Sequence, residues 1–337
     1  MSPLHRTLAA LAVVVGCGTR CANAGLVAAA VIPHGDFAAL PEIAPSTTGR
    51  VAAQRVHAGV HKARELLSEA QPDVVVLITP HGQALSDQFA VYLNAEGAGF
   101  ANLGQDLHNA SSPLVRVEES VQINVNLSKS LLRSLACKDE LCTGLSSFGG
   151  SEAQPLRWGE VIPLSLARLP KNTSFVFISL PSSRYLSSSA LVPRLHKFGL
   201  ELATFLEQQP HRVALLLSSD LAHTHDSSGP YGFSSSAQPF DDAIGRWSRD
   251  PLLHREDLLR DANALVDTAM SCGYLTLIAL QGALEQTGLE KGCWEWRSLA
   301  LEAPTYYGML VADFVRKQCS PIPHQPGSFR QQVNSIK

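Results

Sequence analysis

The chain has 337 residues, of which 45% are hydrophobic and 17% charged, and its formal net charge is -3. This length and composition are typical of a globular protein with a substantial core. The weak net charge and the lack of a basic run exclude nucleic acid and anionic membrane surfaces as expected partners. A small molecule or another protein is the expected partner.

The first residues have the pattern of a secretion signal. Arg6 precedes an apolar run from Leu8 to Val15 that is too short to cross a bilayer, and Ala22-Asn23-Ala24 offers a small-residue cleavage pattern. We therefore expect a signal peptide over residues 1–24, a secretory or extracellular location and no transmembrane segment after its removal. The alternative is a buried first strand of a cytosolic protein.

Two continuous apolar runs follow, each ending in Pro-His-Gly. Gly25 to Ile32 and Asp73 to Thr79 are rich in Val, Ala and Ile and predict buried strands. Between them, Ser46 to Ala70 has helical composition with capping residues at its start. The histidines of the two turns are His34 and His81.

Further along the chain, Ser174 to Leu180 and Arg212 to Ser218 predict two more buried strands, separated by a helix over Ser189 to Gln208. Polar loops are expected from Asn94 to Ser112, from Ser146 to Gln154 and, as a lid or rim, from Ser227 to Pro239. Phe240 to Glu285 is expected to be mostly helical. Thr305 to Arg316 predicts a closing strand or short helix.

Unbroken apolar strands separated by helices predict an α/β fold: a single domain with a mixed, mostly parallel central sheet and helices on both faces. Ligands of such sheets bind beyond the carboxyl ends of the strands. His34, His81 and the segment from Asp220 to His223 each follow a predicted strand. We therefore expect them to converge on one site.

These residue types suit a metal site. Neutral imidazole is the commonest metal ligand among side chains, and two histidines in the same Pro-His-Gly frame leave a shared cation and two structural histidines as equal alternatives. His223, beside Asp220, reads either as a general acid/base or as a loop histidine paired to that aspartate. Cys272 precedes a predicted helix, as a thiolate ligand or nucleophile does, although a small buried side chain is the alternative.

Disulfides are also predicted for the secreted form. Cys137 and Cys142 are close enough in the chain to close a small loop, and Cys293 has Cys319 as its suggested partner. These pairings leave Cys272 without a partner.

The ordered set of motifs resembles the class III extradiol ring-cleaving dioxygenases, including their catalytic B-subunit domains, and the Memo-like proteins. The set comprises both Pro-His-Gly turns, Trp158 to Leu164 (WGEVIPL), Asp220 to His223 (DLAH), Gly229 to Gly232 (GPYG), Phe240-Asp241, Cys272-Gly273 and Tyr307-Gly308-Met309. The resemblance assigns residues 25–317 to such a domain, and residues 318–337 form a polar tail.

The resemblance implies a non-haem Fe(II)-dependent oxidoreductase that opens a dihydroxylated aromatic ring with O2. His34 and His81 match the metal-binding histidines and His223 matches the acid/base. Cys272 stands where the dioxygenases have a glutamate ligand, and Arg157-Trp158-Gly159 replaces their Asp-His-Gly. The metal ligands expected by resemblance are thus His34, His81 and Cys272.

The softer donor set admits Zn or Cu beside Fe(2+). It also keeps two alternatives open: a Memo-like metal- or partner-binding protein with a His2Cys site and little or only redox activity, and a hydrolase that uses a zinc-bound water. A homo-oligomer is compatible with all three.

Overall fold

The central feature of the fold is an eight-stranded mixed sheet. The structure, a computed structural model, describes residues 24–104, 115–135 and 142–319. The strand order is β10-β11-β1-β9-β2-β8-β3-β6. The pairs β1–β9, β9–β2, β2–β8 and β3–β6 are parallel, whereas β10–β11, β11–β1 and β3–β8 are antiparallel. The strands are β1 (Gly25–Ile32), β2 (Val74–Thr79), β3 (Phe89–Tyr92), β6 (Cys142–Leu145), β8 (Ser174–Ser179), β9 (Arg212–Ser218), β10 (Trp294–Glu302) and β11 (Met309–Arg316).

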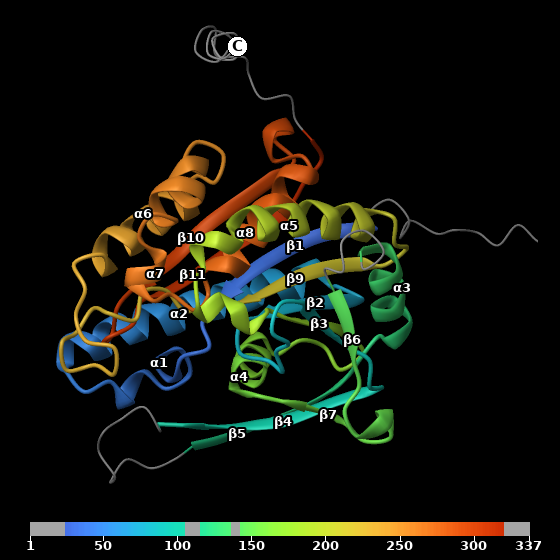
Figure 1. Ribbon diagram of the computed structural model, residues 1–337, viewed down its shortest axis with the longest axis horizontal. Helices are drawn as coiled ribbons and strands as arrows, with labels where there is room; N and C mark the ends of the chain where they lie inside the picture. The colour runs from blue at the N-terminus through green and yellow to red at the C-terminus, as the bar shows by residue number, and fades with distance from the viewer. Residues whose placement is uncertain (1–23, 105–114, 136–141, 320–337) are drawn as a thin grey trace, which may run out of the picture.

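Helices cover both faces of this sheet (Figure 1). One hydrophobic cluster joins the sheet to α3 (Val125–Leu135), α5 (Val192–Glu207), α6 (Ala237–Arg249) and α8 (Tyr274–Gln286). A second cluster joins the opposite face to α1 (Asp36–Ala39), α2 (Thr47–Ala70) and α4 (Trp158–Ala167). Every residue of β1 is buried, as the unbroken apolar run predicts for a strand covered on both sides. The expected fold class is confirmed.

A second, three-stranded sheet lies beyond α4 in Figure 1. It has the order β5-β4-β7 and consists of β4 (Glu96–Leu103), β5 (Val115–Gln122) and β7 (Gln154–Leu156). The expectation of a loop from Asn94 to Ser112 is wrong for the part that forms β4. Small residues let this strand approach its partner, because a Cβ on Gly99 would lie only 2.1 Å from the carbonyl oxygen of Leu156.

The remaining expected elements agree with the structure within a few residues. Ser46 caps α2, and its hydroxyl accepts a hydrogen bond from the Gly49 amide at 2.9 Å. The segment from Thr305 to Arg316 contains a strand, β11, which runs antiparallel to β1. Between α6 and α8 lie a π-helical turn (Asp257–Ala262) and α7 (Val266–Ala269).

The cysteine predictions have a divided outcome. Cys293 and Cys319 form the expected disulfide. Cys142 is a buried free thiol, and its suggested partner Cys137 lies outside the described residues. The predicted signal peptide and almost all of the polar tail also fall outside them.

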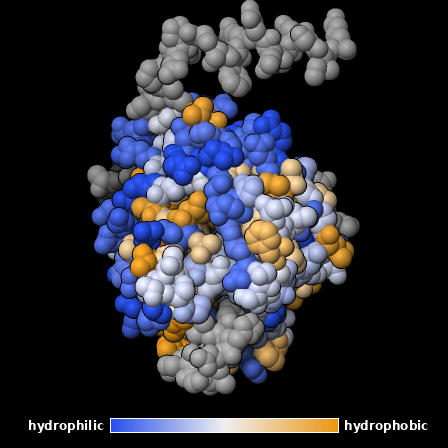
Figure 2. All heavy atoms as spheres, turned by 90° about the vertical axis from the view of Figure 1, so that its left-hand side faces the viewer, coloured by the Kyte–Doolittle hydropathy of each residue, from blue (hydrophilic) through white to orange (hydrophobic). Residues whose placement is uncertain are grey.

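The face on the side of α1 and α6 intermixes hydrophilic and hydrophobic residues, with hydrophilic ones covering the larger part (Figure 2). Among the described helices, none combines the length and apolar character needed to cross a membrane.

Candidate metal site

The site is built at the carboxyl ends of three adjacent parallel strands. β9 lies between β1 and β2, so His34 and His81 follow strands that are not immediate neighbours in the sheet. Their turns nevertheless bend toward each other, and the two imidazole rings lie 4.7 Å apart between centroids, nearly perpendicular. The strand between them ends at Ser218 and contributes the segment from Asp220 to His223.

A hydrogen-bond chain fixes the orientation of His34. Its Nδ1 lies 2.9 Å from the Ser218 hydroxyl, which donates its own proton to the Gly159 carbonyl at 2.6 Å. Because that proton is already used, Ser218 accepts from His34 Nδ1–H. The neutral ring therefore presents the lone pair of Nε2, the usual arrangement of a ligating histidine with its other nitrogen bound to the protein.

Both Pro-His-Gly turns need glycine for close packing. Neither Gly35 nor Gly82 has a positive φ, so backbone conformation is not the reason for glycine at these positions. A Cβ on Gly35 would lie 2.3 Å from the Tyr307 ring, and one on Gly82 would lie 2.5 Å from a Glu160 carboxylate oxygen. Each turn is thus pressed against a side chain behind it.

A buried arginine supports the turn that carries His81. Arg184, in the short helical segment Ser182–Tyr185 after β8, donates to the Pro80 carbonyl and, at 2.6 Å, to the Tyr185 hydroxyl. That hydroxyl lies 3.5 Å from His81 Nδ1. The indole of Trp158 lies over the other side of the imidazole, 5.0 Å away between ring centroids.

Cys272 lies just before α8, and its side chain approaches His34 and His223. A Cβ on Gly273 would lie 2.1 Å from the Ser219 hydroxyl oxygen and 2.6 Å from the Ser219 Cα, so glycine lets this turn pack directly on the exit of β9. The Cys272 thiol sulfur lies 3.3 Å from His34 Nε2 and 4.0 Å from His223 Nε2.

The Asp220 carboxylate contacts His34. One Asp220 carboxylate oxygen accepts from the His34 backbone amide, and the other lies 3.2 Å from His34 Nε2. His223 donates from Nδ1 to the Leu221 carbonyl at 2.7 Å, because a carbonyl only accepts. In the neutral ring Nε2 of His223 thus keeps a free lone pair.

The electrostatics keep all three histidines neutral. Burial, with His223 and Arg184 nearby, lowers the pKa of His34 to about 3. Burial lowers the pKa of His223 to about 4 against the opposing effect of its bond to Leu221. The pKa of His81 is lowered well below its ordinary value by burial and by neighbouring positive groups. Neutral imidazoles are the form that binds metals.

The pKa of the Cys272 thiol is raised by burial and by the Asp220 carboxylate, although Arg184 acts in the opposite direction. A thiol with a raised pKa keeps its proton at neutral pH, and a bound cation would favour its loss.

These donors fit a metal ion. Ligand atoms of His34, His81 and Cys272 all lie within 4.8 Å of one another, as do those of Asp220, His223 and Cys272. With metal–nitrogen and metal–sulfur bonds of about 2.05 and 2.3 Å, a nitrogen and a sulfur bound to one tetrahedral ion lie about 3.6 Å apart. The separation between His34 Nε2 and the Cys272 sulfur, 3.3 Å, is about 0.3 Å shorter than this. An imidazole nitrogen, a carboxylate and a sulfur are all donor groups that a metal ion can bind.

His34, His81, Asp220 and His223 line a cavity of about 760 Å³ with aromatic walls. His223 stacks on Tyr307, with 5.6 Å between ring centroids, and lies edge-on to Tyr231. The lining comprises His34, His81, Asp220 and His223 at the floor, Phe100, Trp158, Tyr231, Tyr306 and Tyr307 as aromatic walls, and Arg157 among the remaining residues.

Two glutamates and one further histidine pair with other side chains. Glu285 pairs with His196 at 2.8 Å, and Glu302 pairs with Arg55 at 3.1 Å. His225 bonds the buried Asp241 carboxylate at 2.8 Å, which makes it a structural residue of the rim. Neither glutamate belongs to the donor cluster.

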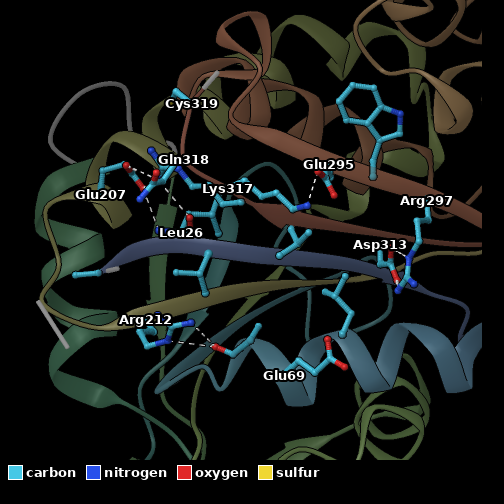
Figure 3. A pocket seen from close by; sticks show the side chains of 17 residues that line it. Leu26, Glu69, Glu207, Arg212, Glu295, Arg297, Asp313, Lys317, Gln318 and Cys319 are labelled. Carbon is cyan, nitrogen blue, oxygen red and sulfur yellow. Dashed lines mark hydrogen bonds and ion pairs between the residues drawn. The ribbon is translucent and has the colours of Figure 1, made fainter. Parts of the chain in front are cut away.

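A second large cavity, of about 730 Å³, lies at the opposite end of the strands, around Leu26 and Arg212 (Figure 3). Its charged side chains are largely paired with one another. Figure 3 shows Lys317 beside Glu295 and Arg297 beside Asp313. Arg316 pairs with Glu207. The residues that line this cavity include no histidine and no free thiol.

Sequence reasoning missed Ser218 and Arg184. Ser218 is the last residue of a predicted strand, and Arg184 lies in a serine-rich segment without a recognisable motif. Their roles depend on which strands are neighbours. Asp220 gave a signal through its place beside His223, but its contact with His34 could not be read from that position.

Comparison with known proteins gives three findings. The sequence pattern of the family described as the catalytic LigB subunit of aromatic ring-opening dioxygenase matches residues 28–306. Protein CA_C1420 of Clostridium acetobutylicum is 22% identical over 247 residues, which are 66% of this chain and 45% of that protein, so the chain spans less than half of its length. The crystal structure of the uncharacterized protein JW3007 from Escherichia coli K12 has 14% identity and a TM-score of 0.47, covering 85% of this chain and 99% of that one.

Proposed function

The chain belongs to the family of the catalytic LigB subunit of aromatic ring-opening dioxygenases, and we propose that it is a metal-dependent oxidoreductase that opens the ring of a dihydroxylated aromatic compound. The convergence of His34, His81 and Cys272 beside an aromatic-walled cavity that both of these histidines line carries this proposal. The family match supports the reaction class, and the cavity supports a small aromatic substrate.

His34, His81 and Cys272 are the proposed ligands of the metal ion. Fe(2+) is the first choice, and Cu or Zn are the alternatives because a thiolate makes the donor set softer. When bound, the ion would supply Lewis-acid and one-electron redox chemistry to the substrate and O2. Ser218 and Arg184 hold the two imidazole-bearing turns in the geometry that such a site requires.

His223 is the proposed acid/base. It lines the cavity, it is neutral because burial lowers its pKa to about 4, and its bond to Leu221 leaves Nε2 as the proton acceptor. A phenolic hydroxyl in the cavity would lose its proton to this nitrogen, which can later return it to the product. Tyr307, stacked on the ring at 5.6 Å, limits its rotation.

The aromatic walls define how the substrate binds. Trp158 is 39% exposed beside His81, and Tyr231 is 53% exposed beside His223. Exposed aromatic side chains at a cavity mouth favour stacking of a flat apolar ring between them. They also displace water from the site once a ring is bound.

A second candidate function follows from Cys272. In the ring-cleaving branch a carboxylate stands at this position, and the cysteine is the Memo-like feature. A buried thiolate beside two imidazoles is a favourable Cu site, so a Memo-like metal-binding protein with redox activity alone is the alternative.

The two functions are separated by anaerobic loading with Fe(2+), followed by air and a panel of catechols, with O2 uptake and the yellow ring-fission product as readouts. Ring cleavage that is lost in His223→Gln while metal content is retained supports the dioxygenase. His211→Gln, which removes a half-buried histidine far from the site, is the matched control. Metal binding without turnover on any catechol supports the Memo-like function.

We also propose a secretory or extracellular location. The disulfide between Cys293 and Cys319 supports it, since disulfides persist in oxidising compartments. Protein recovered from culture medium and sequenced from its first residue tests this proposal. A chain retained in the cytosol with its N-terminus intact would contradict it.

A further inference from the structure

Away from the strand-end site, two histidines lie one turn apart on α2. His57 and His61 occupy positions i and i+4, which place both side chains on one face of the helix. Their ring centroids are 4.7 Å apart and their Nε2 atoms 3.0 Å apart. His61 is exposed and His57 is half-buried, so a solute can reach the pair.

The imidazole of His57 is already oriented. Its Nδ1 lies 2.8 Å from the carbonyl oxygen of Ala38, in α1. A carbonyl only accepts, so Nδ1 carries the proton and Nε2 presents its lone pair toward His61. Binding of the second ring nitrogen to a backbone carbonyl is the arrangement that prepares a histidine for metal ligation.

The separation of the two nitrogen atoms distinguishes coordination geometries. For metal–nitrogen bonds of about 2.05 Å, two ligands at 90° lie about 2.9 Å apart, and two at the tetrahedral angle lie about 3.3 Å apart. The observed 3.0 Å is closer to the 90° pair. Square-planar and tetragonal Cu²⁺ or Ni²⁺ have such pairs, and Cu²⁺ has the higher affinity for nitrogen donors.

Charged residues near the pair change the pKa of His61 and the expected affinity for a cation. Burial, His57, Arg64 and Arg168 lower the pKa of His61, whereas Glu65 acts in the opposite direction. A lowered pKa leaves His61 neutral at pH 7, the form in which it can ligate. The two guanidinium groups repel a cation, so we expect weaker binding here than at a site with three protein ligands.

We propose that His57 and His61 form a second metal site, an exposed two-nitrogen chelate for Cu²⁺ and, more weakly, Ni²⁺. Binding requires the proton of His61 to move from Nε2 to Nδ1 through water, with no change of net charge on the ring. The site shares no ligand with the strand-end cluster and is independent of the proposed function.

The test is a titration of the full chain with Cu²⁺ alone, with bound equivalents and nitrogen coordination read by electron paramagnetic resonance. Wild type is expected to bind one more equivalent than His61→Gln or His57→Gln, whatever the strand-end site contributes. His211→Gln is the matched control and is expected to bind as wild type does. Circular dichroism of the metal-free variants establishes that α2 remains folded.

Equal copper equivalents in wild type and both glutamine variants would overturn the proposal. The pair would then be a hydrogen bond between two imidazoles and nothing more. Failure of the strand-end site to bind metal would lower every count by the same amount and leave the difference between wild type and His61→Gln intact.

Discussion

Replacing Ser218 with alanine removes the contact that orients His34. The hydroxyl accepts from His34 Nδ1 at 2.9 Å and donates to Gly159 at 2.6 Å. In the variant the buried Nδ1–H loses its acceptor, which costs about 1–3 kcal/mol of stability. Loss of such an outer contact to a ligating histidine lowers metal affinity by about 10- to 100-fold, or about 1.4–2.7 kcal/mol.

The assay pairs two measurements: metal affinity by competition with a chromophoric chelator, and stability of the metal-free protein by urea unfolding. Ser219→Ala is the matched control, because among the described residues the adjacent buried Ser219 hydroxyl has no hydrogen-bond partner. We expect Ser219→Ala to keep wild-type metal affinity. Equal affinities for Ser218→Ala and wild type would refute the reasoning that Ser218 sets the tautomer of His34.

Three further predictions concern the thiol, the histidines and the disulfide. Cys272→Ala is expected to lose the strand-end metal, whereas Cys142→Ala, which removes the second free thiol of the described residues, retains it. Elemental analysis measures the metal content, and equal metal content in the two variants would argue against the ligand role. The pKa values of His34 and His223, about 3 and about 4, lie below the unfolded value of 6.5, so the unfolded chain binds more protons in this range. Metal-free protein should therefore be most stable above pH 6.5 and lose stability toward pH 4; urea midpoints that are the same at pH 7 and pH 5 would contradict this. Cys319→Ser opens a 26-residue loop, which lowers stability by about 3.5 kcal/mol in the chain-entropy treatment, and an unchanged unfolding midpoint would count against it.

The parts of the fold that follow from sequence are those with a strong local pattern. β1, β2, β8 and β9 are continuous apolar runs, and their buried positions in the sheet account for that pattern. β4 contains Gly97 and Gly99 and few β-branched residues, so its strand character depends on pairing with β5 and β7.

Some residues of the candidate site can likewise be identified from sequence, whereas others cannot. His34, His81, His223 and Cys272 were identifiable because each lies at the end or the beginning of a predicted element. The strand order was not, since no local signal says that β9 lies between β1 and β2. The contacts made by Ser218 and Arg184 depend on that order and on loop conformation, so they do not follow from the local sequence.

The most direct measurement is anomalous X-ray diffraction from crystals of the protein loaded with a single metal ion. The account predicts an anomalous peak within about 2.0–2.4 Å of a ring nitrogen of His34, a ring nitrogen of His81 and the Cys272 sulfur. A peak that is absent from this cluster at full metal loading, or one bound by Asp220 and His223 without the other two histidines, would contradict it.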